Sequence, residues 1–415
     1  MLPALQSAIG LLALVAVTFL FSARRDAISR SLVAKALGLQ LLLALLLLKL
    51  PGSQQVFLAL NDGLVALQTA TVAGTSFIFG YVGGGPAPFE VVDGSAVFIF
   101  AFQALPLVMV VSVLSALLMY WKILPLIMRG FSLVLERALS ISGACGLAIS
   151  ANAFLGMVEA PLLIRSYLAS LNRGELFTVM CAGMATIAGT MLALEAAIIS
   201  PVVPGALGHL ISCSIITLPA VVYIAHLLEP DSVTDLKVEP SLEGNPESAM
   251  DALMSGTQDG LMLYLNIIAM IIVVVALTAL VNLTLGIFPD VLGAPVTLER
   301  ILGVIMTPLA LATGVPWGEA RVVGDLLGTR LVLTELVAYI RLGDLPPEVL
   351  TERSRILATY ALCGFANLGG LGIMLAGLTT MVPERRAEIL ELGFKAVAAG
   401  TLATCSTAAV VGILL

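Results

Sequence analysis

The feature that most constrains this chain is a series of apolar runs, each about as long as a bilayer is thick. Residues 2–21 contain no charged side chain, and residues 31–50 contain only Lys35 and Lys49. About 20 apolar residues in a helix cross the hydrocarbon core. Of the 415 residues, 59% are hydrophobic and 11% are charged, whereas soluble proteins carry roughly 25% charged residues. The chain is therefore predicted to be an all-α polytopic membrane protein.

Eight transmembrane helices are predicted, at 3–21, 31–50, 95–120, 176–199, 204–226, 258–285, 353–378 and 389–413. Arg24, Arg25 and Arg30 follow the first run, and basic residues favour the cytoplasmic side of a membrane. The first loop is then cytoplasmic, which places both termini outside the cytoplasm. No basic region precedes the first run, so the run does not resemble a cleaved signal peptide. We expect a multi-pass protein of the cell (inner) membrane.

Composition also argues against several functions. A net charge of −7 provides no basic patch for nucleic acid. The cysteines stand singly, without the spacing of a metal or disulfide framework; they are Cys145, Cys181, Cys213, Cys363 and Cys405. The chain has two histidines and no HExxH or GxSxG motif, so neither an enzyme nor a cofactor is expected.

Two apolar stretches, 143–171 and 318–343, are broken by charged and small residues. Non-helical backbone at membrane depth persists only where protein or a water-filled cavity satisfies its polar groups. Both stretches are therefore predicted to be re-entrant helical hairpins. Interfacial segments are predicted at 52–94, a helix and loop interrupted by Asn61-Asp62-Gly63, and at the amphipathic helices 124–141 and 298–313.

The two broken stretches belong to an internal repeat. Glu159 and Glu335 each stand six residues before an arginine, and the octets 183–190 and 364–371 align without gaps. With the predicted spans, the first unit enters the membrane from the cytoplasm and the second from outside. Inverted repeats of this kind are typical of secondary transporters, whose sites lie near the midplane.

The predicted organisation has five parts. They are scaffold spans with an interfacial segment at 1–120, a first repeat of interfacial helix, hairpin and two spans at 121–227, a cytoplasmic loop at 228–257, a scaffold span at 258–296, and a second repeat at 297–415.

The repeat explains why a chain with so few charges places glutamates in its hairpins. A carboxylate in the hydrocarbon costs at least ~2.5 kcal/mol, so two at equivalent positions indicate the two halves of a binding site. The alternative is an ion pair with Arg165 or Arg341, but residues six apart on one helix face different directions. The octets are poor helix formers. They fit local unwinding that exposes carbonyls, or else close packing of small residues.

At these residues the chain resembles the concentrative nucleoside transporters. The resemblance runs over nearly the whole chain and is carried by NAFLGMVEAP (152–161), GELFTVMCAGMATIAGT (174–190), GVPWGEA (314–320), LVLTELVAY (331–339) and CGFANLGG (363–370). It implies nucleoside import by cation symport, a homotrimer, an early scaffold, and a mobile transport domain that carries both repeats.

Family roles transfer to the residues that match. The resemblance implies a sodium site made by Asn152, Leu155, Thr186 and Ile187, and a substrate site made by Gly156, Met157, Val158, Glu159, Glu335, Phe365, Asn367 and Gly370. Met157 and Val158 replace the family's Gln-Thr, Thr334 replaces its usual Asn, and Gly370 replaces its usual Ser. Because an apolar lining cannot hydrogen-bond a base edge, altered nucleobase selectivity is expected.

Two alternatives stay open at this point. The coupling ion is Na⁺ or H⁺, with Na⁺ favoured because Thr186 keeps the hydroxyl. The cargo is a nucleoside, or else a nucleoside-derived metabolite or other solute carried by a transporter of the same gate-like fold.

Overall fold

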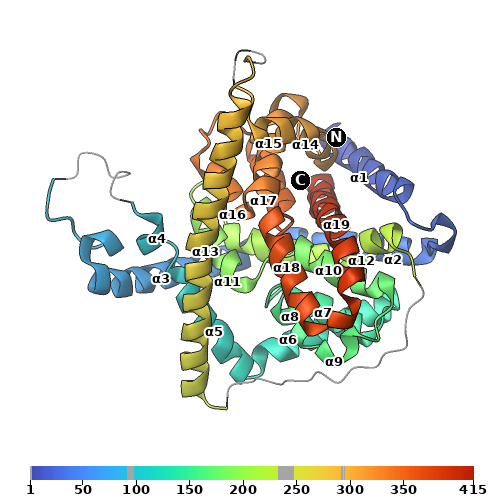
Figure 1. The fold of residues 1–415 in the computed structure, drawn as a ribbon, viewed down its shortest axis with the longest axis horizontal. Coiled ribbons are helices and arrows are strands. Elements are labelled where there is room, and N and C mark those ends of the chain that lie inside the picture. The colour runs from blue at the N-terminus through green and yellow to red at the C-terminus, as the bar shows by residue number, and fades with distance from the viewer. Residues whose placement is uncertain (1, 91–97, 232–246, 291–292, 294) are drawn as a thin grey trace.

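The computed structural model describes residues 2–90, 98–231, 247–290, 293 and 295–415, and its regular secondary structure within these ranges is helical (Figure 1). The first part contains α1 Leu2–Leu20, α2 Arg30–Lys49, α3 Ser53–Phe79, α4 Phe100–Gln103 and α5 Leu107–Tyr120. Short 3₁₀ turns lie at Arg25–Ala27, Gly80–Gly83 and Pro383–Arg385. A single long helix, α13 Ala249–Leu285, stands between the two repeats in the sequence.

Eight of the described helical segments are long and apolar enough to cross a membrane. They are 3–20, 30–49, 55–83, 100–120, 173–199, 206–228, 249–285 and 383–414. The prediction of a multi-pass helical membrane protein with eight such helices is confirmed, although the set of eight differs from the predicted one.

Several predicted boundaries are corrected. Asn61-Asp62-Gly63 does not interrupt α3, which is continuous and long enough to span the bilayer. The predicted spans 176–199 and 353–378 each consist of two helices separated by a break. α13 begins at Ala249, so the end of the predicted loop 228–257 is helical; residues 232–246 of that loop, and 91–94 of the segment 52–94, lie outside the described residues.

The first repeat contains α6 Ile123–Leu139, α7 Gly143–Asn152, α8 Glu159–Leu162, α9 Arg165–Leu168, α10 Arg173–Ala185, α11 Gly189–Ile199 and α12 Ala206–Leu228. Capping residues set the starts of its helices. Ser142 caps α7 through its hydroxyl, and Asn172 forms a capping box with Glu175 at the start of α10. Both caps satisfy backbone N–H groups that a helix end leaves without partners.

The second repeat follows the same order, with α14 Leu298–Thr313, α15 Trp317–Val332, α16 Glu335–Asp344, α17 Glu352–Leu362, α18 Leu368–Met381 and α19 Arg386–Leu414. Thr297, Thr334, Thr351 and Asn367 cap α14, α16, α17 and α18. In each repeat the helix before the hairpin packs on its first arm, α6 on α7 and α14 on α15.

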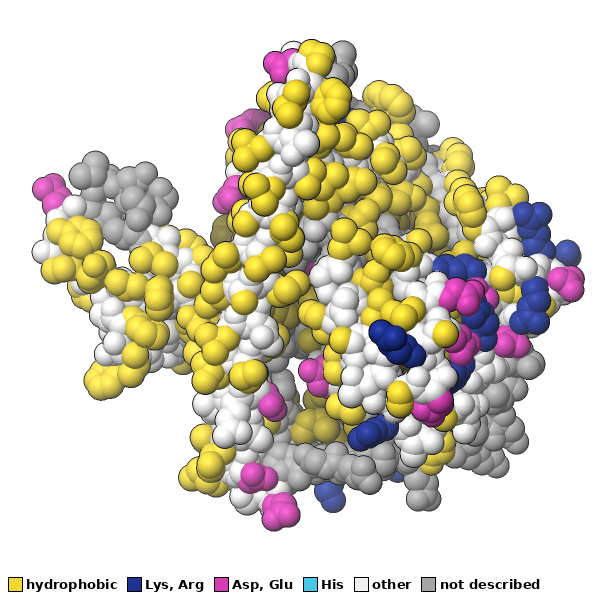
Figure 2. All heavy atoms as spheres, in the orientation of Figure 1, with side chains coloured by type: hydrophobic (Ala, Val, Ile, Leu, Met, Phe, Trp, Pro, Cys, Tyr) yellow, Lys and Arg dark blue, Asp and Glu magenta, His cyan; other side chains and the backbone are white. Residues whose placement is uncertain are grey.

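The hydrophobic faces divide the molecule into a packed body and peripheral helices. α10 and α12 of the body are largely buried, whereas α3 and α13 are mostly exposed. Figure 2 shows hydrophobic side chains covering the visible face of α13, while Lys and Arg gather on the right side of the view. An exposed apolar surface of this extent suits contact with lipid or with a second chain.

Candidate functional site

A cavity of about 190 Å³ lies where the hairpins, the two helix breaks and α13 meet. All eight predicted substrate residues line it: Gly156, Met157, Val158, Glu159, Glu335, Phe365, Asn367 and Gly370. The second hairpin and the second break contribute the last four of these, which are more than 150 residues distant in sequence from the first four. The structure therefore brings both halves of the predicted site to one place.

The tip of the first hairpin depends on Gly156. Its φ is +133°, a backbone conformation that favours glycine. A Cβ at this position would stand 2.7 Å from the Glu159 Oε2 atom and 3.3 Å from the Ala188 Cβ atom. The absence of a side chain lets the Glu159 carboxyl group fold back over the turn, where it is exposed to the cavity.

The second hairpin holds its glutamate by a different arrangement. Glu335 is the first residue of α16, follows the capping residue Thr334, and is 1% exposed. Its Oε2 atom accepts a hydrogen bond from Asn367 Nδ2 at 2.7 Å, and Asn367 Oδ1 accepts one from Gly370 N at 2.6 Å. Asn367 thus caps α18 and also orients the Glu335 carboxylate. Glu335 of the hairpin and Asn367 of the break therefore form one polar unit.

Met157 and Val158 pack closely on glycines of neighbouring helices. Met157 is 8% exposed, and its Cβ atom lies 3.0 Å from the position that a Cβ on Gly183 would take. The Val158 methyl groups lie 3.3 Å from the equivalent position on Gly377. A Cβ on Gly370 would stand 2.6 Å from the Phe365 carbonyl oxygen, so a serine there would require this backbone to shift.

The predicted ion ligands gather at the end of α7 and at the first helix break. Asn152 is the last residue of α7, and Thr186 is the first residue after α10. The Thr186 hydroxyl donates to the Asn152 carbonyl at 3.2 Å and to the Ala182 carbonyl at 3.0 Å. Ile187 is buried in the break, and Leu155 lines the cavity. A hydroxyl, an amide and backbone carbonyls are oxygen donors that fit a hard cation.

The second helix break also touches the end of α10, directly before the first break. The first interrupts the chain at 186–188, between α10 and α11, and the second at 363–367, between α17 and α18. A Cβ on Gly364 would stand 2.9 Å from the Met184 carbonyl oxygen and 3.0 Å from Thr404 Cγ2. Both octets predicted to unwind therefore contain a break, and glycine at 364 allows the close approach.

Arginines 165 and 341 do not neutralise the hairpin glutamates within the described residues. Arg165 is exposed. Arg341 donates to Thr329 Oγ1 at 2.7 Å and pairs with Glu299 at 3.3 Å. In the second hairpin, Arg341 therefore forms its ion pair with Glu299 and not with Glu335.

Several cavity residues have no counterpart in the sequence-based site. α13 contributes Asn266 and Met270, and α11 contributes Thr190 and Met191. Asn266 lies alone among apolar residues of a predicted span, and a lone polar residue in a span is a signal of function. This pattern could have identified Asn266 as a cavity residue, whereas nothing in the sequence distinguishes Met270 from its apolar neighbours.

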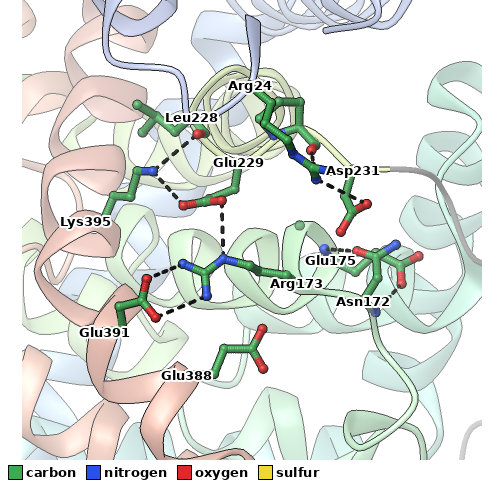
Figure 3. Close-up of polar contacts among 12 residues, drawn as sticks. Arg24, Asn172, Arg173, Glu175, Leu228, Glu229, Asp231, Glu388, Glu391 and Lys395 are labelled. Carbon is green, nitrogen blue, oxygen red and sulfur yellow. Dashed lines mark hydrogen bonds and ion pairs between the residues drawn. The ribbon is translucent and has the colours of Figure 1, made fainter. Parts of the chain in front are cut away.

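A charged cluster ties the helix ends of the two repeats together outside the cavity (Figure 3). Arg173 of α10 pairs with Glu391 of α19 at 2.7 Å and with Glu229, the residue after α12, at 3.4 Å. Lys395 of α19 pairs with Glu229 at 2.6 Å. Arg24 also pairs with Asp231 at 3.5 Å. The first three contacts join α10, α12 and α19 into one unit at this end.

Comparison with known proteins agrees with this architecture. Three family profiles match consecutive parts of the chain: the N-terminal part of Na⁺-dependent nucleoside transporters at residues 9–82, a gate described as nucleoside recognition at 101–202, and the C-terminal part of Na⁺-dependent nucleoside transporters at 209–412.

Full-length relatives show the same relationship. The chain is 32% identical to the nucleoside permease NupC of Helicobacter pylori over 419 residues, which cover 99% of this chain and 97% of that protein. It is 30% identical to the sodium/nucleoside cotransporter 2 of Rattus norvegicus, in an alignment that covers 98% of this chain and 62% of that protein. A solved structure of CNTnw in an inward-facing substrate-bound state matches with a TM-score of 0.89 at 33% identity, covering 99% of this chain and 97% of that chain.

Proposed function

Because the chain belongs to the concentrative nucleoside transporter family, we propose that it imports nucleosides across the cell (inner) membrane by symport with sodium. The observation that carries this proposal is the single cavity in which a carboxylate from each hairpin meets the two helix breaks. In many secondary transporters the substrate site lies at the interface of two repeats and is formed by interrupted helices.

The polar unit of Glu335 and Asn367 is the part of the cavity suited to sugar hydroxyls. The Glu335 carboxylate already accepts one hydrogen bond from Asn367 at 2.7 Å and has further lone pairs for a substrate donor. Phe365 offers an aromatic wall beside it. A ribose therefore binds towards the second hairpin in this proposal.

The base then lies towards Met157 and Val158. These side chains offer no hydrogen bond to a base edge, and an apolar lining discriminates weakly among polar groups. We expect selectivity to shift towards apolar or modified bases, or to broaden.

Sodium binding at Asn152, Leu155, Thr186 and Ile187 couples the ion to the substrate. The ion would bridge the end of α7 and the first break, the two elements that hold the Gly156 turn. Ordering this turn completes one wall of the cavity. The two repeats would then move as a unit past α13 within a homotrimer, with both termini outside the cytoplasm.

A second candidate is transport of a nucleoside-derived metabolite or another solute, coupled to H⁺ or Na⁺. The departures at Met157, Val158 and Gly370 favour it because they alter three positions of one cavity.

Uptake of a radiolabelled panel of nucleosides and bases into proteoliposomes, with and without an inward sodium gradient, tests the proposal. Sodium-driven uptake of at least one nucleoside is expected in the wild type. Glu335→Gln should lower it by roughly 10- to 100-fold, since hydrogen bonds to charged groups contribute about 1.5–3 kcal/mol. Glu319→Gln is the matched control. Glu319 also lies on the second hairpin, but its carboxylate is at the exposed end of that hairpin, where it accepts a hydrogen bond from the Thr351 hydroxyl.

The ion site is tested in parallel with Asn152→Leu. This variant should keep the fold and lose the sodium dependence. Full sodium dependence in Asn152→Leu would place the ion elsewhere, and folded protein that carries no nucleoside of the panel would favour the second candidate.

A further inference from the structure

Glu195 is a buried carboxyl group that the nucleoside and sodium sites leave unused. It lies in the middle of α11 and is 0% exposed. Neither of its carboxyl oxygens has a hydrogen-bond partner among the described residues. An ionised carboxylate without partners in such surroundings costs several kcal/mol, so the group is expected to carry a proton or to be neutralised by a cation.

The charged and titratable groups on the elements around α11 determine whether Glu195 carries a proton or is neutralised by a cation. α16 places Glu335 and Tyr339 within electrostatic reach of Glu195, and the end of α17 places Cys363 there. On α12, Cys213 interacts with Cys363, whereas His209 bonds the Tyr360 hydroxyl at 3.2 Å. α5 carries no charged residue, and Asp62 of α3 is exposed.

The nearby positive charge that interacts with Glu335 is the Arg330 guanidinium, which is 1% exposed. Its hydrogen bonds go to the Ala361 carbonyl at 2.6 Å and to Thr401 and Thr404 at 2.8 and 3.1 Å. One guanidinium balances one carboxylate. With Glu335 ionised for the substrate, Glu195 has no charge left to balance its own.

We propose that Glu195 is a proton-binding site behind the substrate cavity, linked to substrate binding through Glu335. The proton on Glu195 leaves Glu335 as the single anion beside Arg330, free to accept hydrogen bonds from the substrate. When Glu195 releases the proton to water, its negative charge repels that of Glu335, so Glu335 is less able to stay ionised and substrate binding weakens. Since binding and protonation are reciprocal, the bound substrate holds the proton on Glu195.

This inference goes beyond the sodium site and rests on the proposed function only for its substrate readout. Nucleoside affinity of the purified protein at saturating sodium is measured across a pH series. In the wild type, affinity should fall as the pH rises, by up to about tenfold per pH unit, the limit for linkage to one proton. Glu195→Gln mimics the protonated form, so its affinity should stay high and independent of pH.

Glu229→Gln is the control, because Glu229 is another buried carboxylate but is paired with Arg173 and Lys395 away from the cavity. It should keep the pH dependence of the wild type.

A second readout does not involve the substrate. Infrared spectra should contain a carboxylic C=O stretching band that is present in the wild type and in Glu229→Gln, and lost in Glu195→Gln. Its absence from the wild type would overturn the proton site, as would an unchanged pH dependence in Glu195→Gln. If no nucleoside binds at any pH while the band behaves as expected, the proposed cargo is wrong and the proton site stands.

Discussion

In the proposed function, substrate selectivity depends on two side chains at the tip of the first hairpin. Met157 fills the space beside Gly183, and Val158 packs on Gly377. We propose that an amide or a hydroxyl at these two positions would reach a base edge. The polar half of the cavity, built by Glu335 and Asn367, is unaffected by them.

Replacing these two side chains tests this division of roles. Met157→Gln with Val158→Thr should raise the discrimination between bases with different polar edges by roughly 10-fold or more, since a matched hydrogen bond contributes about 0.5–1.5 kcal/mol and an unmatched buried one costs more. Competition of unlabelled nucleosides against labelled uptake measures it. Met157→Leu, which changes the side-chain shape without adding a polar group, is the control for packing, and an unchanged ranking of nucleosides in the double variant would place the base elsewhere.

The sequence predicted the cavity residues that belong to recognisable motifs. It did not predict the buried charged residues that lie outside such motifs. Glu159 and Glu335 stand at equivalent repeat positions, and Asn367 follows in the second octet. Glu195 has no such pattern, because its proximity to Glu335 arises only when α11 packs against α16. It appears in the sequence as one charge in an apolar run, without a partner that spacing could identify.

Helix breaks are the elements that give this site its backbone groups. The poor helix propensity of both octets predicted them, and breaks occur at 186–188 and 363–367. The same reasoning failed for α3, where Asn61-Asp62-Gly63 was read as an interruption. One glycine costs about 1 kcal/mol in a helix, which a helix of 27 residues tolerates.

Close contact between the second break and the end of α10 should be sensitive to a single methyl group. Gly364→Ala would place a Cβ 2.9 Å from the Met184 carbonyl oxygen, and overpacking of this kind costs typically 1–3 kcal/mol. We expect a lower midpoint of thermal unfolding in detergent. Gly372→Ala is the control, since nothing lies within 4 Å of its Cβ position. Equal stability of both variants would contradict the packing of the second break on the end of α10.

At the scale of the whole molecule, the cavity lies between a body made of the two repeats and the separate helix α13. The cluster of Arg173, Glu229, Glu391 and Lys395 joins helices of both repeats, which suits movement as one unit. α13 closes the cavity from outside this unit with Met270, whose Cε atom lies 2.8 Å from the Cβ position of Gly369. Alternating access in this arrangement requires α18 to slide past α13.

Linking these two helices should therefore stop transport without emptying the site. In a Met270→Cys, Gly369→Cys protein, a short bis-methanethiosulfonate reagent would join α13 to α18 through two disulfide bonds. The five native cysteines are buried, which limits side reactions. Uptake should fall to background on cross-linking and return on reduction, while nucleoside binding in detergent changes far less. Each single cysteine variant treated with the same reagent controls for blocking of the cavity. Sustained uptake by the cross-linked protein would mean that the repeats do not move past α13, and that access to the cavity alternates through the hairpins alone.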